Sequence, residues 1–179
     1  MATARQNGNL RPLPDYLRRG LRLLFVGYNP GLRSARVGHY YAGRGNQFWP
    51  FLWEAGLIPE QLSHSDDSRL LDFNMGLTDI VKRPTRGVGT LTQPDYRPGT
   101  DALQKKIQLY RPRAVAFVGK GVYKKFAGRR VDLGPQPERI LGARVFVLPS
   151  TAGTNTWLTR AEKLEYFKQL AQWLKGVAA

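Results

Sequence analysis

The sequence predicts an α/β fold: a three-layer α/β/α sandwich built on a short, mostly parallel central sheet. Three segments are almost entirely apolar, and each stops at Gly or Pro. Near-continuous apolar runs of this kind are typical of strands buried on both faces, as in a parallel sheet covered by helices. The chain has 179 residues. This length suits one hydrophobic core, so we expect a single domain over residues 1–179.

Four segments are candidate strands: the apolar runs Leu21–Gly27, Ala114–Val118 and Val145–Leu148, and a weaker candidate, Leu77–Val81. The first run ends at a Gly/Asn/Pro cluster, the second at Gly119 and the third at Pro149. Open α/β sheets bind ligands beyond the carboxyl ends of their strands. The residues that follow these strands are therefore candidates for a binding site.

Three helices are expected. Thr159 and Glu162 match a capping box, and apolar residues then recur at helical spacing at Leu164, Phe167, Leu170, Ala171 and Leu174. A second helix is expected over Gln47–Ala55. A third is expected to be capped by Thr100 or Asp101 and to end before Pro112, because a residue that precedes proline avoids the helical conformation. The Gly- and Pro-rich segments Gly87–Gly99 and Gly128–Pro137 are interpreted as surface loops.

The composition indicates a polyanionic partner. Lys and Arg number 28 against 13 Asp and Glu, and the surplus extends along the whole chain, so the folded surface is expected to be cationic. Solubility, or a host with basic proteins, is the alternative explanation. The absence of cysteine excludes disulfides, thiolate metal sites and iron–sulfur clusters. We expect no metal and no cofactor.

No apolar run is long enough to span a bilayer, and no apolar stretch or cleavage signal follows the N-terminal arginines. We therefore expect a soluble protein of the cytoplasm. The sequence gives no sign of oligomerisation, so a monomer is the default expectation.

The turn Gly27-Tyr28-Asn29-Pro30-Gly31 follows the first predicted strand directly. Its glycines would let backbone N–H groups approach a ligand closely. An ordinary strand-to-loop turn is the alternative, since Asn-Pro and Pro-Gly are common turn formers.

A glycine-broken aromatic segment, residues 38–49, comes next. A nucleic-acid base can stack on an aromatic ring, and Tyr41 is the candidate. The aromatic and aliphatic residues that follow are interpreted as the core face of a helix: Phe48, Trp49, Phe51, Leu52 and Trp53. After the last strand, the small residues Ser150, Thr151, Ala152 and Gly153 would contact phosphate without steric bulk, although a simple helix-entry loop is the alternative.

Taken together, these blocks resemble the mismatch-specific uracil/thymine-DNA glycosylases, a branch of the uracil-DNA glycosylase superfamily. The family's Gly-Ile-Asn-Pro-Gly block is similar to residues 27–31, its Asn-Arg-Phe-Trp block to 46–49, and its Thr-x-x-Val-x-Arg-Pro-Thr block to 78–85. Val118-Gly119-Lys120 and Pro149-Ser150 resemble two further blocks. The resemblance extends from about Leu21 through the C-terminal helix. The superfamily's best-known branch has Asp and His where this chain has Asn29 and Leu148.

The resemblance implies a uracil-DNA glycosylase-like fold and a monofunctional hydrolase that flips uracil, or another damaged pyrimidine, out of DNA and leaves an abasic site. DNA is then the partner, which suggests a nucleoid-associated protein. Asn29 would hold the attacking water through its amide oxygen. Gly27, Tyr28, Tyr41 and Asn46 would bind the base. The residues implied to contact DNA are Lys120, Ser150, Thr151, Ala152 and Gly153.

Asp79 stands in an otherwise apolar segment that the resemblance places near the pocket. It would act as a general base or stabilise a positive charge on the sugar. The alternative is a structural role, in which Asp79 pairs with Lys82 or Arg83 or caps a turn. The family pattern does not require an acid at this position.

The loop after the last strand has no leucine or arginine among Thr151, Ala152, Gly153 and Thr154. Without a bulky side chain to insert into the duplex, the space that a flipped base leaves is poorly filled. Single-stranded DNA is therefore a candidate substrate. Phosphate contacts are expected from Lys105 and Lys106, Lys120, Lys124 and Lys125, and Arg129 and Arg130. A DNA-binding module without catalysis is the rival hypothesis. A nucleotide-phosphate site at Gly119-Lys120-Gly121 is disfavoured because the phosphate-loop spacing is missing.

Overall fold

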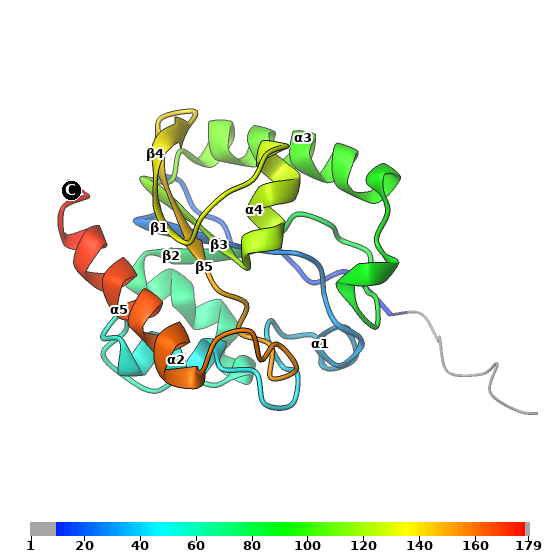
Figure 1. Cartoon of the computed structure of the whole chain (residues 1–179), viewed down its shortest axis with the longest axis horizontal. Coiled ribbons are helices and arrows are strands. Elements are labelled where there is room, and N and C mark those ends of the chain that lie inside the picture. Colours follow the sequence, from blue (N-terminus) through cyan, green and yellow to red (C-terminus); the bar gives the residue numbers. More distant parts are fainter. Residues whose placement is uncertain (1–9, 178–179) are drawn as a thin grey trace, which may run out of the picture.

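The structure is a computed structural model and describes residues 10–177 (Figure 1). Residues 1–9 and 178–179 lie outside the described part. The two ends of the predicted 1–179 domain therefore lie outside it, as does most of the N-terminal segment that was searched for a cleavage signal. The described strands are β1 (Leu23–Gly27), β2 (Met75–Asp79), β3 (Ala114–Val118), β4 (Gly134–Ile140) and β5 (Ala143–Leu148). They form one sheet in the order β2-β1-β3-β5-β4.

The sheet is parallel except for β4, which pairs antiparallel with β5 at one edge. The helical elements are α1 (Leu32–Val37), α2 (Phe48–Glu54), η1 (His64–Phe73), η2 (Val88–Thr90), α3 (Gln93–Tyr110), α4 (Lys120–Ala127) and α5 (Arg160–Lys175). In Figure 1, α3 and α4 cover one face of the sheet while α2, η1 and α5 cover the other. The predicted three-layer α/β architecture is confirmed.

The predicted strands agree closely with β1, β3 and β5. Every residue of β1 and β3 is buried, as is every residue of β5 except Arg144. The predicted Leu77–Val81 strand begins two residues earlier and ends at Asp79. The prediction of a loop over Gly128–Pro137 was wrong at its end, where β4 begins. Pro135 and Pro137 concealed this strand, and an edge strand tolerates prolines because one side of it makes no ladder hydrogen bonds.

The predicted start of the third helix at Thr100 or Asp101 was wrong. Helix α3 begins at Gln93, with Thr92 as its N-cap, and the Thr92 amide donates to the Asp95 carboxylate at 2.8 Å. Most of the predicted Gly87–Gly99 loop is therefore helical. Pro94 is favourable in the first turn, whereas Pro98 lies inside the helix and made the segment look like a loop. The end before Pro112 is confirmed.

The C-terminal helix begins as its capping box predicts, with the Thr159 amide donating to Glu162 at 2.7 Å. Helix α2 also agrees with its prediction. Four of the five residues assigned to its core face are buried, but Trp53 is 46% exposed. Helices α1 and α4 had no sequence prediction. No helix within residues 10–177 is long and apolar enough to cross a membrane.

Candidate active site

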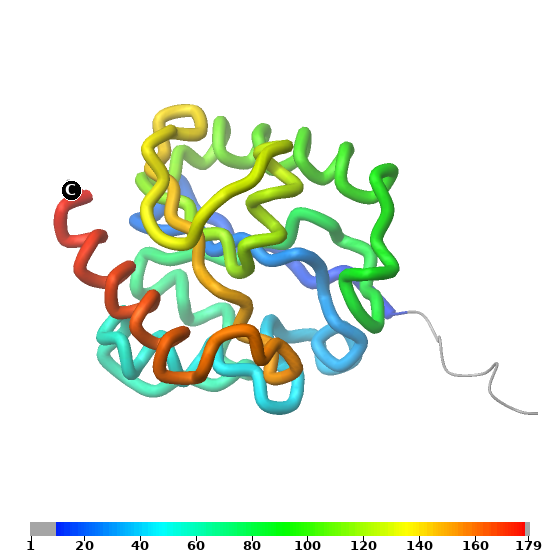
Figure 2. Tube along the Cα trace, in the orientation of Figure 1, coloured from blue at the N-terminus to red at the C-terminus, as the bar shows by residue number. Residues whose placement is uncertain are grey.

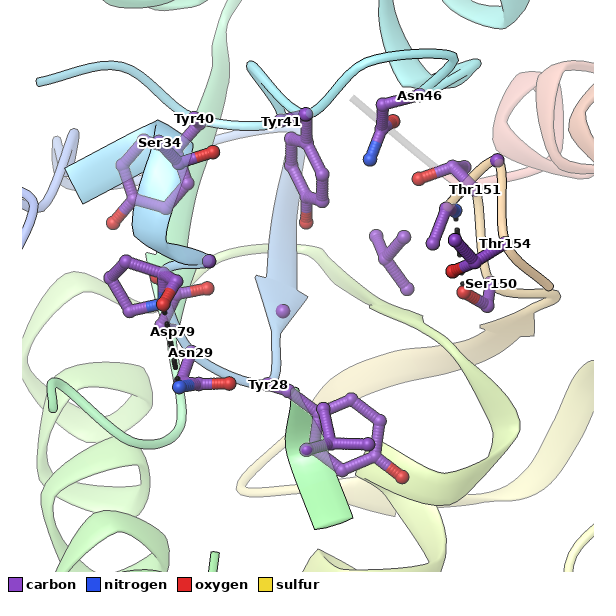
Figure 3. A pocket seen from close by; sticks show the side chains of 18 of the residues that line it. Tyr28, Asn29, Ser34, Tyr40, Tyr41, Asn46, Asp79, Ser150, Thr151 and Thr154 are labelled. Carbon is purple, nitrogen blue, oxygen red and sulfur yellow. Dashed lines mark hydrogen bonds between the residues drawn. The ribbon is translucent and has the colours of Figure 1, made fainter. Parts of the chain in front are cut away.

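A cavity of about 380 Å³ lies beyond the carboxyl ends of the parallel strands (Figure 3). Four segments line most of it: the turn 27–31 after β1, the segment 40–46 before α2, Asp79 at the end of β2, and the loop 150–154 after β5. Figure 2 shows the loop after β5 beside the segment that leads into α2. The chain thus brings together ten residues singled out in the sequence: Gly27, Tyr28, Asn29, Tyr41, Asn46, Asp79, Ser150, Thr151, Ala152 and Gly153.

Gly27 and Asp79 are paired in register at the ends of β1 and β2. A β-carbon at position 27 would lie 2.5 Å from Asp79 Oδ1 and 3.0 Å from the Tyr41 hydroxyl oxygen. Only glycine leaves room for both groups. The first glycine of the turn therefore creates the space that the Asp79 carboxyl and the Tyr41 hydroxyl occupy.

Asp79 is only 6% exposed, and its Oδ2 atom has no hydrogen-bond partner. Burial raises the pKa of the Asp79 carboxyl to about 7, although the positive charge of Lys82 opposes the shift. The alternative of a structural ion pair was wrong, because Lys82 contacts Asp15 and Arg83 pairs with Asp95 at 2.9 Å. A buried carboxyl without partners is costly, and such groups cluster at functional sites.

Asp15, not Asp79, pairs with the nearby lysines. Its carboxylate contacts Lys82, lies 2.7 Å from Lys106 Nζ and accepts a hydrogen bond from Thr78 at 2.7 Å. Burial alone would raise the pKa of Asp15, but the hydrogen bond with Lys106 and the charge of Lys82 lower it below its usual value. One of the predicted phosphate-binding lysines, Lys106, is therefore engaged inside the protein.

Asn29 is held in one orientation by its amide nitrogen. This nitrogen donates to the Arg83 carbonyl and to the Thr85 hydroxyl, both at 2.8 Å. The Thr85 hydroxyl itself donates to the Gly87 carbonyl at 3.0 Å. A carbonyl only accepts hydrogen bonds, so the NH₂ end of Asn29 must face Arg83, and the amide oxygen is left for the cavity (Figure 3).

Tyr41 forms part of the cavity wall. Its ring stacks on Phe48, with centroids 3.9 Å apart and planes at 20°, so one ring face is covered. Its φ of 55° lies in the left-handed region, which is uncommon for a residue other than glycine and costs conformational energy. The buried hydroxyl has no partner. Burial raises its pKa well above the usual value, which keeps the hydroxyl a neutral donor.

Asn46 and the loop after β5 form the opposite wall. The Asn46 side-chain oxygen accepts from the Phe48 amide at 3.0 Å, which leaves the NH₂ group directed into the cavity (Figure 3). A β-carbon on Gly153 would lie 2.9 Å from the Gly45 carbonyl oxygen. The two loops therefore meet backbone to backbone, and the small residues predicted for phosphate contact also permit this close packing.

Tyr28 turns away from the cavity centre (Figure 3). Its ring lies edge-on to Tyr96, with centroids 6.3 Å apart, and a β-carbon on Gly121 would lie 1.6 Å from its hydroxyl. Gly121 is therefore required to accommodate Tyr28, which gives this glycine a structural reason.

Lys120 does not line this cavity. It lines a second one, of about 500 Å³, together with Lys124 and Arg130. The other predicted basic residues have different surroundings: Lys125 lies 5.0 Å from the Tyr96 ring centroid, and Arg129 pairs with Glu138.

Sequence reasoning missed two arginines on the wall of the first cavity, Arg44 and Arg86, both exposed. Neither arginine belongs to the basic clusters that were predicted to bind phosphate, so those clusters did not point to them. It also missed the part of Thr85 in holding Asn29, although Thr85 closes a block that matched the family pattern. Within residues 10–177, no group of three or more His, Cys, Asp or Glu is placed to hold a metal ion.

The chain matches the family model of the uracil DNA glycosylase superfamily over residues 14–175. It is also similar to a protein from Methanosarcina acetivorans that was solved by solution NMR and described as a candidate uracil DNA glycosylase. That match has a TM-score of 0.61 and 22% identity, and covers 90% of this chain and 98% of the other. At this identity, the match concerns the fold.

Proposed function

The chain belongs to the uracil DNA glycosylase superfamily, and on that premise we propose that it removes uracil from DNA as a monofunctional, mismatch-specific glycosylase. One observation carries the proposal. The Asn29 amide oxygen, the Tyr41 hydroxyl and the Asp79 carboxyl converge on one cavity, and the last two are buried without partners. Unsatisfied groups that face one cavity are expected where a polar ligand completes their hydrogen bonds.

In the proposed reaction, water adds to C1′ of the deoxyribose and the bond from C1′ to N1 of uracil breaks. The electron pair leaves with the base, and the sugar passes through a positively charged state. The fixed amide of Asn29 positions the water through its oxygen, since a neutral amide is too weak a base to remove a proton. The ionised Asp79 carboxylate accepts a water proton and stabilises the positive charge on the sugar.

The flipped base would lie between the two walls of the cavity. The uncovered face of Tyr41 is the surface on which it stacks, and the free NH₂ group of Asn46 is a donor for a uracil carbonyl oxygen. The exposed side chains of Arg44 and Arg86 would attract the phosphates on either side of the flipped nucleotide. Ser150, Thr151, Ala152 and Gly153 are the proposed contacts with the DNA backbone.

The proposal is tested by uracil excision from labelled oligonucleotides, followed by alkaline cleavage of the abasic product. We expect product from uracil opposite guanine and from single-stranded uracil DNA. We also expect Asn29→Ala to reduce the single-turnover rate by about 10²-fold or more while DNA binding is retained. A wild-type protein that binds DNA but yields no product on any uracil duplex or single strand would be a binding module instead.

A further inference from the structure

The loop between β5 and α5 carries a feature that the proposed site does not use. Its first half, residues 150–154, lines the cavity, and its second half carries Trp157, which is 65% exposed. Within residues 10–177 this is the highest exposure among the large apolar side chains. A single exposed apolar residue is ordinary, so the significance of Trp157 depends on its surroundings.

Lys120 lies next to the Trp157 ring. Its ammonium group lies 5.7 Å from the centroid of the Trp157 ring, and Lys120 begins α4 directly after β3. The tryptophan therefore lies at the carboxyl edge of the sheet, where the loops after β3 and β5 approach each other. This is the edge at which the proposed active site opens.

The second cavity adjoins the same lysine. Lys120, Lys124 and Arg130 give it three positive charges, opposed by Asp132, which lies 3.7 Å from Lys120 and is fully exposed. The two cavities are separated by Tyr28, which lines the first and touches Gly121 of the second. Cationic side chains beside an exposed aromatic ring match a nucleotide, which carries a phosphate and a flat base.

We infer that Trp157 and Lys120 form a stacking platform for an unpaired base next to the flipped nucleotide, with the strand's phosphates held by Lys124 and Arg130. The inference rests on the proposed function, because the platform lies beside the proposed uracil site. It also supplies what the loop 151–154 lacks: an aromatic ring that can stack against an unpaired base. A base already stacked in an intact duplex presents no free face, so the platform favours single-stranded or locally opened DNA.

The test compares Trp157→Ala and Trp157→Phe with Trp53→Ala, which removes the other strongly exposed tryptophan, 46% exposed on α2 and absent from both cavities. The probe is a labelled single strand that contains 2′-fluoro-2′-deoxyuridine, whose fluorine opposes positive charge at C1′ and prevents cleavage. We expect Trp157→Ala to raise Kd by about tenfold on this strand. Trp157→Phe should retain most of the affinity, and Trp53→Ala should match wild type.

Two further readouts separate stacking from other causes. The slope of log Kd against log salt should not change in Trp157→Ala, because no phosphate contact is lost. Tryptophan emission quenched by the single strand should be quenched less in Trp157→Phe and should remain quenched in Trp53→Ala. Affinity in Trp157→Ala within twofold of wild type, or an equal loss on undamaged duplex, would overturn the inference.

These measurements do not depend on cleavage. If the wild-type protein excises no uracil but Trp157→Ala still weakens single-strand binding, the glycosylase proposal fails and the platform stands. If excision is normal and Trp157→Ala binds the single strand as tightly as wild type, the platform inference fails and the glycosylase proposal stands.

Discussion

Asp15 and Asp79 are two carboxyl groups that lie near the end of β2 and have opposite environments. Asp15 contacts two lysines and the hydroxyl of Thr78, whereas the neighbouring Asp79 is more deeply buried and leaves one oxygen without a partner. Lys82 acts on the pKa values of both groups, yet it contacts only Asp15. The lack of a partner at Asp79 is therefore not due to a shortage of cations.

The contrast indicates that the two carboxyl groups have different roles, Asp15 in stability and Asp79 in function. Asp15 stabilises the fold by fixing the N-terminal segment to β2 and α3. Asp79 raises the free energy of the folded state, because a buried carboxyl without partners is poorly solvated. Native proteins retain such groups mainly at functional sites. Removing the Asp79 charge should therefore impair activity and improve stability, while changing Asp15 should affect activity only through Asp79.

The largest expected effect is that of Asp79→Asn on cleavage. The variant keeps the size of the side chain but can neither accept a proton nor stabilise a cation by charge, so the single-turnover rate should fall by about 10²-fold or more. The Kd for uncleavable DNA should stay within a few-fold of wild type. The control is Asp72→Asn, an exposed carboxylate outside the cavity. Normal cleavage by Asp79→Asn would end the catalytic assignment.

The same variant should be more stable than wild type at alkaline pH. In the unfolded chain the Asp79 carboxyl ionises near 3.8, and in the folded protein near 7. Between these values the folded state binds more protons than the unfolded state, so its stability falls as pH rises, and the loss is complete above about pH 7. Asp79→Asn removes this loss. We expect urea unfolding at pH 8 to show a gain of about 2–4 kcal/mol, which shrinks towards zero at pH 4.

The comparison also shows where sequence reasoning succeeds. The strands were predictable because burial on both faces leaves uninterrupted apolar runs. Asn29 and Asp79 could be singled out as cavity-lining candidates because they follow or end such runs. Other features depend on contacts between distant segments. Nothing near Asp79 in the sequence shows that Lys82 contacts Asp15, and Pro98 and Pro135 conceal elements that tertiary packing stabilises. The alternative that paired Asp79 with Lys82 was reasonable locally and wrong for this reason.

A smaller effect is expected from Thr85→Val. The Thr85 hydroxyl accepts one of the two short hydrogen bonds from the Asn29 amide nitrogen, so valine would leave the Arg83 carbonyl at 2.8 Å and the Pro30 carbonyl at 3.4 Å to fix that end. Because Thr85 acts through Asn29, we expect kcat to fall by about tenfold with little change in KM. Thr85→Ser should recover most of the rate. A loss in Thr85→Ser equal to that in Thr85→Val would show that the hydroxyl alone does not hold Asn29, and would contradict this role.

The smallest expected effect is that of Asp15→Asn, and it concerns pH. The positive charges of Lys82 and Lys106 lower the pKa of Asp79, and the negative charge of Asp15 raises it. Neutralising Asp15 removes the opposing charge and releases Lys82 towards Asp79, so the pKa of Asp79 should fall and the midpoint of the rate against pH should move below that of the wild type. Asp72→Asn, an exposed carboxyl whose ion pair with Arg69 is 3.9 Å long, should leave the midpoint in place. A role of Asp15 confined to folding would lower stability without moving the midpoint, and an upward movement would show that Asp15 does not hold Lys82 away from the site.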